Sequence, residues 1–222
     1  MKVDKFRTVI IYITIILLGL VCLLPLLNIV AISFSSSAAV EGNMVGLIPV
    51  GFSTAAYKKI LEDSQFWHSF LISVERVVLT LIINFVLIVL MAYPLSKTNA
   101  QFRGRNIYAN LMIFAMLFNG GMIPTFLLVK SYGLLNTVWA LVLPGAVPIF
   151  NVILVMNFFA AVPKELEEAA FIDGANPLQV LTKIFIPISK PVLATVSLFS
   201  IVGSWNDFYS GLIYMSKAAY YP

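Results

Sequence analysis

The chain alternates between long apolar blocks and short polar connections. Five of the blocks are long enough to cross the hydrocarbon core of a bilayer as a helix, which takes about 20 residues. The apolar residues run continuously, without the alternation of a membrane β-barrel strand, so each block is expected to be helical. The expected spans cover approximately residues 9–32, 67–94, 107–129, 138–160 and 188–215. The pattern predicts an all-α, polytopic membrane helix bundle that forms one domain over residues 1–222.

The composition indicates a membrane protein and argues against several kinds of chemical site. Hydrophobic residues make up 60% of the chain and charged residues 11%, whereas a soluble domain is about a quarter charged. The single cysteine, Cys22, can form no intrachain disulfide, and the sequence places no cysteine or second histidine with His68 to make a classical zinc site. Gly46 and Gly51 have the separation of a phosphate-binding loop, but Phe52 stands where its lysine belongs. We therefore expect no metal, no cofactor and no enzymatic activity in this chain.

The distribution of lysine and arginine predicts the orientation, because cytoplasmic loops carry an excess of these residues. The first block is longer than the core of a signal peptide (about 7–15 residues) and contains Pro25, so we expect it to be retained. With the N-terminus in the cytoplasm, the cytoplasmic segments hold Lys2, Lys5, Arg7, Lys97, Arg103, Arg105, Lys164, Lys183 and Lys190. The opposite side holds Lys58, Lys59, Lys130 and Lys217, and Arg76 falls within a span. We expect a plasma-membrane protein with its N-terminus in the cytoplasm.

A short acidic segment, PKELEEAAFIDGANP (163–177), separates the fourth and fifth blocks on the predicted cytoplasmic side. Pro163 suits the first turn of a helix, the glutamates suit its positive end, and Gly174 suits its C-terminal cap. Leu166, Ala169, Ala170 and Asp173 follow the spacing of one helical face. A helix of ten residues is marginal alone. From these residues, a solvated loop helix and a docking helix remain open.

The same segment resembles the EAA motif of ATP-binding-cassette (ABC) importer permeases. That motif reads Glu-Ala-Ala, three residues, Gly, nine residues, then Ile-x-Leu-Pro. Here the matching positions are Glu168, Ala169, Ala170, Gly174, Ile184, Ile186 (in place of leucine) and Pro187. The stretches AYPLSK (92–97), GLLNTVWALVLP (133–144) and GSWNDF (203–208) resemble the carbohydrate-uptake branch, nearest to the maltose-system type without extra N-terminal helices. NGGMIPTFLLVKSYGLLNT resembles the subgroup of Gram-positive bacteria that imports oligosaccharides or polysaccharide fragments.

The resemblance implies a bacterial type I importer permease that forms half of a sugar pathway. Its expected partners are a second homologous permease, a cytoplasmic ABC ATPase dimer that hydrolyses the ATP, and an extracellular sugar-binding protein. It also implies that the helix 163–173 docks on the ATPase. The implied docking positions are Glu168, Ala169, Ala170, Asp173 and Gly174. Family members carry a sixth core span after the fifth, and this sequence ends before it, so we expect an incomplete chain.

Ionisable groups inside the spans are costly and usually face a cavity or a partner. Glu75 and Arg76 in the second span and Asp207 in the fifth lie at similar depths, about 12 Å from the outer end. We expect Arg76 to pair with Asp207 or Glu75 and to brace the outer half of the bundle. Candidate residues for the sugar pathway are Asn151, Trp205, Asn206 and Asp207.

Two alternatives remain open for these polar residues and for the function. Intramembrane polar side chains can instead join helices by hydrogen bonds worth about 1 kcal/mol or less. An ion-coupled secondary transporter is the alternative function, although it would need a carboxylate relay, for which only Glu75 and Asp207 are available, and no inverted repeat is visible.

Overall fold

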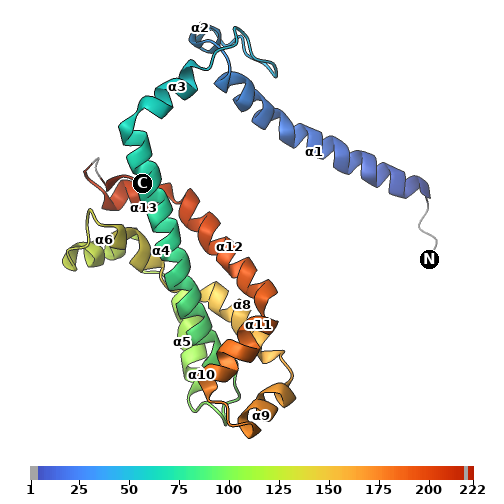
Figure 1. Cartoon of the computed structure of the whole chain (residues 1–222), viewed down its shortest axis with the longest axis vertical. Coiled ribbons are helices and arrows are strands. Elements are labelled where there is room, and N and C mark those ends of the chain that lie inside the picture. Colours follow the sequence, from blue (N-terminus) through green and yellow to red (C-terminus); the bar gives the residue numbers. More distant parts are fainter. Residues whose placement is uncertain (1–4, 218–219) are drawn as a thin grey trace. The chain divides into compact units, whose positions relative to one another are not determined.

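The computed structural model describes residues 5–217 and 220–222, and this part of the chain is helical and contains no strand (Figure 1). Lys2, used above to predict the orientation, lies outside the described residues. The elements are α1 (Lys5–Ser33), α2 (Ser37–Glu41), α3 (Ala55–Glu62), α4 (Ser64–Leu95), α5 (Arg105–Leu117), α6 (Met122–Ser131), α7 (Val138–Val142), η1 (Leu143–Gly145), α8 (Ile149–Ala160), α9 (Lys164–Ile172), α10 (Pro177–Val180), η2 (Leu181–Phe185), α11 (Ile186–Ile188), α12 (Lys190–Asn206) and α13 (Phe208–Tyr214). The predicted all-α class is confirmed.

The chain divides into two compact units, Met1–Trp67 and His68–Pro222. In the first unit, the apolar side chains of α1 are exposed along nearly the whole helix, as expected for a helix surrounded by lipid. The connection after α1 is fastened to its last turns. Asn28 Nδ2 donates to the Gly46 carbonyl (2.7 Å), and the Ser35 hydroxyl donates to the Ala31 carbonyl (2.6 Å) and accepts from Val50 N (3.0 Å).

Two helices, Arg7–Ser33 within α1 and Ser64–Leu95 (α4), are each long and apolar enough to cross a membrane. Three further candidates are bent pairs of helices, so the number of candidates rises to five if each pair forms one span. The helical path bends by 110° between α5 and α6, by 47° between the segment Val138–Gly145 and α8, and by 84° between the segment Pro177–Ile188 and α12. The five hydrophobic blocks therefore correspond to helical segments, three of them interrupted.

Local chemistry explains the interruptions. At the first, Gly121 has φ 88°, a backbone conformation that favours glycine, and this resolves the GGMIP segment as a bend. In the fourth block, Pro148 precedes α8 and separates it from η1. The 84° bend lies at Ser189, where α11 ends and α12 begins, with a proline in the first turn of α12. Within the fifth block, the continuous helix expected over 188–215 has a further break: it ends at Asn206, and Asp207 begins α13 by accepting a hydrogen bond from Ser210 N (3.1 Å). The hydrophobic pattern alone did not indicate the breaks at Pro148 and Asp207.

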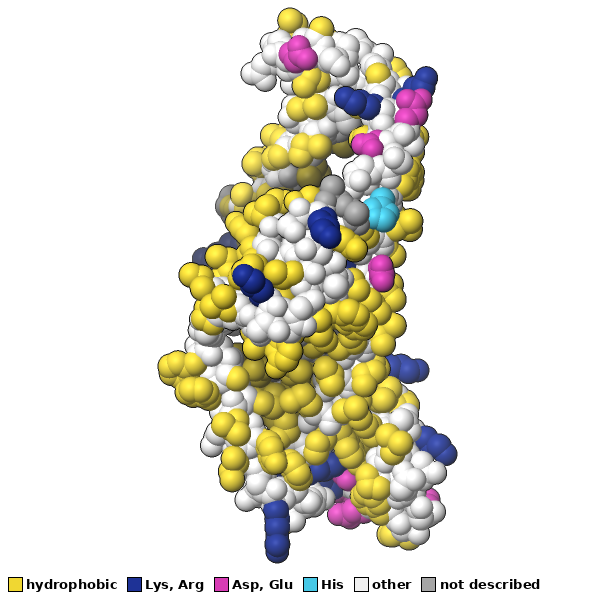
Figure 2. Space-filling model, turned by 90° about the vertical axis from the view of Figure 1, so that its left-hand side faces the viewer, with side chains coloured by type: hydrophobic (Ala, Val, Ile, Leu, Met, Phe, Trp, Pro, Cys, Tyr) yellow, Lys and Arg dark blue, Asp and Glu magenta, His cyan; other side chains and the backbone are white. Residues whose placement is uncertain are grey.

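The second unit is built around α4, against which parts of α5, α8, η2 and α12 pack. Its main core consists of Ile88, Val89, Ala92, Leu95, Met112, Val152, Val155, Phe159, Val162, Val180, Leu181, Phe185, Val192, Leu193 and Val196. A smaller core joins α6, α7 and α13 through Val129, Ala140, Leu141, Tyr214 and Met215. Figure 2 shows mostly apolar side chains over the middle of this unit and charged ones gathered at its lower end, where Figure 1 places α9.

Candidate functional sites

The acidic segment folds as the short helix α9, which begins and ends where its sequence predicts. Pro163 occupies the N-cap position and Asp173 the C-cap. Gly174 follows with φ 83°, and its N–H donates to the Phe171 carbonyl (3.1 Å), while Ala175 N donates to the Ala170 carbonyl (2.9 Å). This pair of bonds is the Schellman motif, in which a left-handed glycine closes the helix. The next helix, α10, begins with a capping box between Asn176 and Gln179.

One side of α9 is exposed and carries most of the predicted docking positions. Glu168, Ala169, Asp173 and Gly174 are exposed, and Ala170 is half-buried. Glu168 forms no ion pair with any of the residues that the structure describes. Large apolar side chains are exposed beside these positions: Leu166, Phe171, Ile172 and Leu178. An exposed apolar patch bordered by polar residues is typical of a surface that binds another protein.

The opposite side of α9 carries a buried ion pair that the sequence did not indicate. Glu167 Oε2 lies 2.7 Å from the Nζ of Lys97, two residues beyond the end of α4, and the two side chains are 11% and 12% exposed. The same Nζ lies over the Tyr93 ring (4.1 Å from its centroid) and the Phe185 ring (4.2 Å). Burial lowers the pKa of Lys97 below its ordinary value, and the carboxylate of Glu167 opposes this effect.

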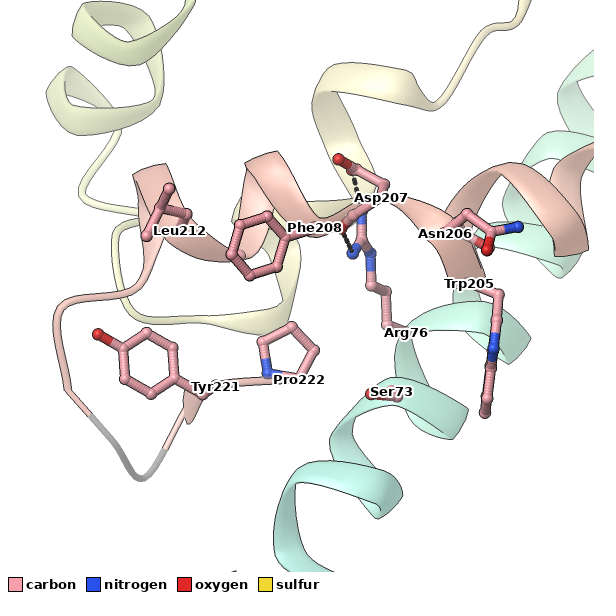
Figure 3. A pocket seen from close by; sticks show the side chains of 11 residues that line it. Ser73, Arg76, Trp205, Asn206, Asp207, Phe208, Leu212, Tyr221 and Pro222 are labelled. Carbon is pink, nitrogen blue, oxygen red and sulfur yellow. Dashed lines mark hydrogen bonds and ion pairs between the residues drawn. The ribbon is translucent and has the colours of Figure 1, made fainter. Parts of the chain in front are cut away.

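Arg76 and Asp207, predicted to lie at similar depths, meet on α4 and at the start of α13 (Figure 3). The guanidinium forms an ion pair with the Asp207 carboxylate through Nη2, and its Nη1 donates to the Asp207 carbonyl (2.9 Å). Glu75, the other candidate acid, is exposed and is not paired with Arg76. Arg76 is therefore held by both the side chain and the backbone of one residue, at the break between α12 and α13.

A cavity of about 570 Å³ opens beside this pair. Its lining residues include Ser73, Arg76, Ser204, Trp205, Asn206, Asp207 and Phe208. Trp205 is 54% exposed, with its edge against Phe70 (6.1 Å between ring centroids), and Asn206 Nδ2 donates to the Val202 carbonyl (2.9 Å). Three of the four candidate pathway residues thus line one cavity. The fourth, Asn151, is buried on α8 and does not line it.

A second buried polar cluster, around Asn84 on α4, was also missed from the sequence. The Asn84 amide lies 3.3 Å from the Gly145 carbonyl, 3.0 Å from the Ala146 carbonyl and 3.2 Å from the Ser200 hydroxyl. Because carbonyl oxygens only accept hydrogen bonds, the amide nitrogen faces them. This cluster joins α4 to the bend between η1 and α8 and to α12. No local signal identifies it, because Asn84 is one polar residue within a long apolar helix.

Comparison with known proteins identifies the family. A family model, described as the inner membrane component of binding-protein-dependent transport systems, matches residues 48–220. LplC of Bacillus subtilis is 44% identical over 204 residues, which cover 92% of this chain and 68% of LplC. YtcP of B. subtilis, described as a polygalacturonan/rhamnogalacturonan transport system permease protein, is 42% identical over 219 residues, which cover 99% of this chain and 76% of YtcP.

A solved structure supports the same conclusion for the fold. A chain from a bacterial ABC transporter that imports the acidic polysaccharide alginate matches this chain with a TM-score of 0.92 at 34% identity, covering 100% of this chain and 79% of that one. The fold is therefore that of a type I ABC importer permease in the membrane. The chain belongs to the family of binding-protein-dependent transport system inner membrane components, and the predicted resemblance is confirmed.

Proposed function

We propose that this chain is a permease subunit of an ATP-driven importer of oligosaccharides and forms half of the translocation pathway. The observation that carries the proposal is the 42% identity, along 99% of the chain, to a permease described as transporting polygalacturonan and rhamnogalacturonan. The match to an alginate importer supports the same substrate class. The family match also favours this function over an ion-coupled transporter.

The proposed assembly contains a second homologous permease, a cytoplasmic ATPase dimer and an extracellular sugar-binding protein. Within it, the exposed side of α9 binds the ATPase. Glu168 offers carboxylate acceptors, Ala169 and Ala170 allow close approach, and the apolar Phe171 and Ile172 supply area to bury. Asp173 and Gly174 close the helix, so they position this surface.

The proposed orientation places the N-terminus and α9 in the cytoplasm. The Lys97–Glu167 pair puts the connection that follows α4 at the same end of the second unit as α9. The positive residues Arg103 and Arg105 belong to that connection and to the start of α5, and Lys164 and Lys183 flank the docking surface. An excess of Lys and Arg near this end supports a cytoplasmic location under the positive-inside rule.

The proposed sugar pathway includes the cavity beside Arg76 and Asp207. Trp205 offers an aromatic face, and Asn206, Ser73 and Ser204 offer hydrogen-bonding groups of the kind that bind sugar hydroxyls. In this arrangement the Arg76–Asp207 pair braces the wall of the cavity. Asn151, buried outside the lining, contributes to the pathway only if the bundle rearranges during transport.

The test is reconstitution of the complex that co-purifies with the tagged chain, followed by uptake of neutral and uronate-containing oligosaccharides into liposomes. We expect uptake to require ATP and the cognate binding protein. Charge reversal by Glu168→Lys should remove the ATPase from the complex and abolish uptake. The matched control, Glu41→Lys at an exposed site on α2, should change neither. Uptake driven by a proton or sodium gradient in the absence of the ATPase would contradict the proposal.

A further inference from the structure

We propose that Lys97 and Glu167 are positioning residues that make α9 move together with α4, so that displacement of the docking helix reaches the membrane-spanning bundle. The rings of Tyr93 and Phe185 face the Lys97 ammonium and belong to the same group of contacts. Lys97, Glu167, Tyr93 and Phe185 are together called the Lys97 cluster. The inference rests on the proposed function, because it assumes that an ATPase binds and moves α9.

Glu167 is the main anchor of α9 in the bundle. It is the one buried residue of this nine-residue helix, in a chain segment whose other acidic residues, Glu165, Glu168 and Asp173, are exposed. A helix of this length is marginal by itself, so its position depends on the contacts of its inner side. Ala170, Val162 just before α9 and Ala175 just after it also pack in or against the core, but these apolar contacts are not directional. The charge-assisted hydrogen bond from Lys97 is directional and sets the register.

Lys97 is in turn held firmly to the end of α4. Its backbone N–H donates to the Pro94 carbonyl (3.2 Å), and Ser96 N donates to the Ala92 carbonyl (2.9 Å), so the last turn of α4 continues to this point. Arg105 Nε donates to the Leu95 carbonyl (2.8 Å), which fastens the start of α5 to the same turn. A force on the Lys97 side chain therefore acts on α4 and α5.

The aromatic members extend the connection to two further helices. Phe185 is buried in η2, the segment that links α9 and α10 to α12, and its ring lies edge-on to Tyr93 of α4 (5.1 Å between centroids) and Phe159 of α8 (5.4 Å). A lysine ammonium over two ring faces gains cation–π attraction, which is stronger in a desolvated site. Separating Glu167 from Lys97 would leave charges in a largely buried place, which is costly. Moving the cluster as a unit avoids that cost.

The experiment uses the complete reconstituted transporter and measures the sugar taken up per ATP hydrolysed, together with the amount of ATPase bound. Lys97→Met and Glu167→Gln remove one charge each while keeping similar side-chain length. We expect both to retain the bound ATPase and to lose about fivefold or more of the uptake per ATP, the scale of typical coupling between sites. Lys97→Arg, which keeps the charge, should retain most of the coupling. The controls Lys59→Met on α3 and Glu41→Gln on α2 make the same changes at exposed positions outside the docking surface and should match the unaltered complex.

A second measurement separates a mechanical role from a merely structural one. In a Cys22→Ser background, Lys97→Cys combined with Glu167→Cys should be uncoupled, and a short bifunctional thiol reagent that bridges the two positions should restore uptake per ATP. If the ion pair only helped the chain to fold, a crosslink that lacks both charges would not restore the uptake per ATP.

Three outcomes would overturn the inference. Unchanged uptake per ATP in Lys97→Met and Glu167→Gln would show that the ion pair does not couple α9 to α4. Loss of bound ATPase in Glu167→Gln alone would show that Glu167 contacts the ATPase directly. Bridged cysteines that stay uncoupled would exclude a mechanical link. If the unaltered complex shows no ATP-dependent uptake, it is the proposed function that fails, and this result is distinct from the three above.

Discussion

The Arg76–Asp207 pair predicts that removing the acid destabilises the protein more than removing the base. The Arg76 side chain is 5% exposed and that of Asp207 is 32% exposed. Asp207→Asn would leave a buried guanidinium without a counter-charge, and losing one partner of a buried pair costs about 3–5 kcal/mol. The bond from Nη1 to the Asp207 carbonyl remains, so we expect a cost near 3 kcal/mol, at the low end of that range.

Removing the base has a smaller expected effect, because the remaining carboxylate borders the cavity and keeps part of its exposure. For Arg76→Gln we expect about 1–2 kcal/mol, between the values for surface pairs and buried pairs. Asparagine at position 207 can still accept the hydrogen bond from Ser210 N that caps α13, whereas alanine cannot. Asp207→Ala should therefore cost about 1 kcal/mol more than Asp207→Asn.

The assay is the free energy of unfolding of the purified protein, titrated with SDS in a mild detergent. The expected order of destabilisation is Asp207→Ala, then Asp207→Asn, then Arg76→Gln. The double variant Arg76→Gln/Asp207→Asn should be more stable than Asp207→Asn alone, since neither charge remains. If Arg76→Gln proved as damaging as Asp207→Asn, the reasoning from unequal burial would be refuted.

Three further predictions concern other parts of the second unit. The pKa of Lys97 is lower in the folded protein than in the unfolded chain, so just below pH 10.5 the unfolded chain binds more protons. The contribution of Lys97 to the free energy of unfolding therefore rises with pH in that range. The difference in melting temperature between the unaltered protein and Lys97→Arg should accordingly increase in favour of the unaltered protein from neutral pH to pH 10. A difference that does not change with pH would contradict the prediction. Gly174→Ala should cost about 1–2 kcal/mol of unfolding free energy through its positive φ alone, because the added Cβ meets no atom within 4 Å. Asn84→Leu should cost about 1 kcal/mol by removing the hydrogen bonds from the amide to the Gly145 and Ala146 carbonyls, whereas Asn110→Leu at an exposed position of α5 should be close to neutral in the same unfolding titration.

The bounds of α9 could be predicted closely because its signals are local. The segment 163–173 was expected, and α9 runs from Lys164 to Ile172 with Pro163 and Asp173 as its caps. Proline at the start and glycine just after the end act through the backbone of their own residues. The breaks at Pro148 and Asp207 also have local causes, but a long apolar run conceals them when hydrophobicity is the main signal.

The pairing of charges could be predicted only in part. Glu75 and Asp207 lie at similar depths in the membrane, so the sequence allowed either as the partner of Arg76. In the structure Arg76 pairs with Asp207, 131 residues away in the chain. Glu167 was one of several acids on a short helix, and nothing near it in the chain pointed to Lys97, 70 residues away. Depth along a helix can be counted from the sequence. Rotation about the helix axis, which decides the neighbour, depends on how the helices pack.

The sequence by itself determined the membrane class, the helical segments, the excess of positive charge at one end and the capped helix with the EAA spacing. Each of these follows from residues close together in the chain or from overall composition. The tertiary structure decided which polar groups meet: Arg76 with Asp207, Lys97 with Glu167, and Asn84 with the bend before α8. It also decided that Trp205 and Asn206 line a cavity while Asn151 is buried elsewhere. The physical reason is that a buried charge or amide needs a partner, and packing between helices distant in sequence determines which partner is within reach.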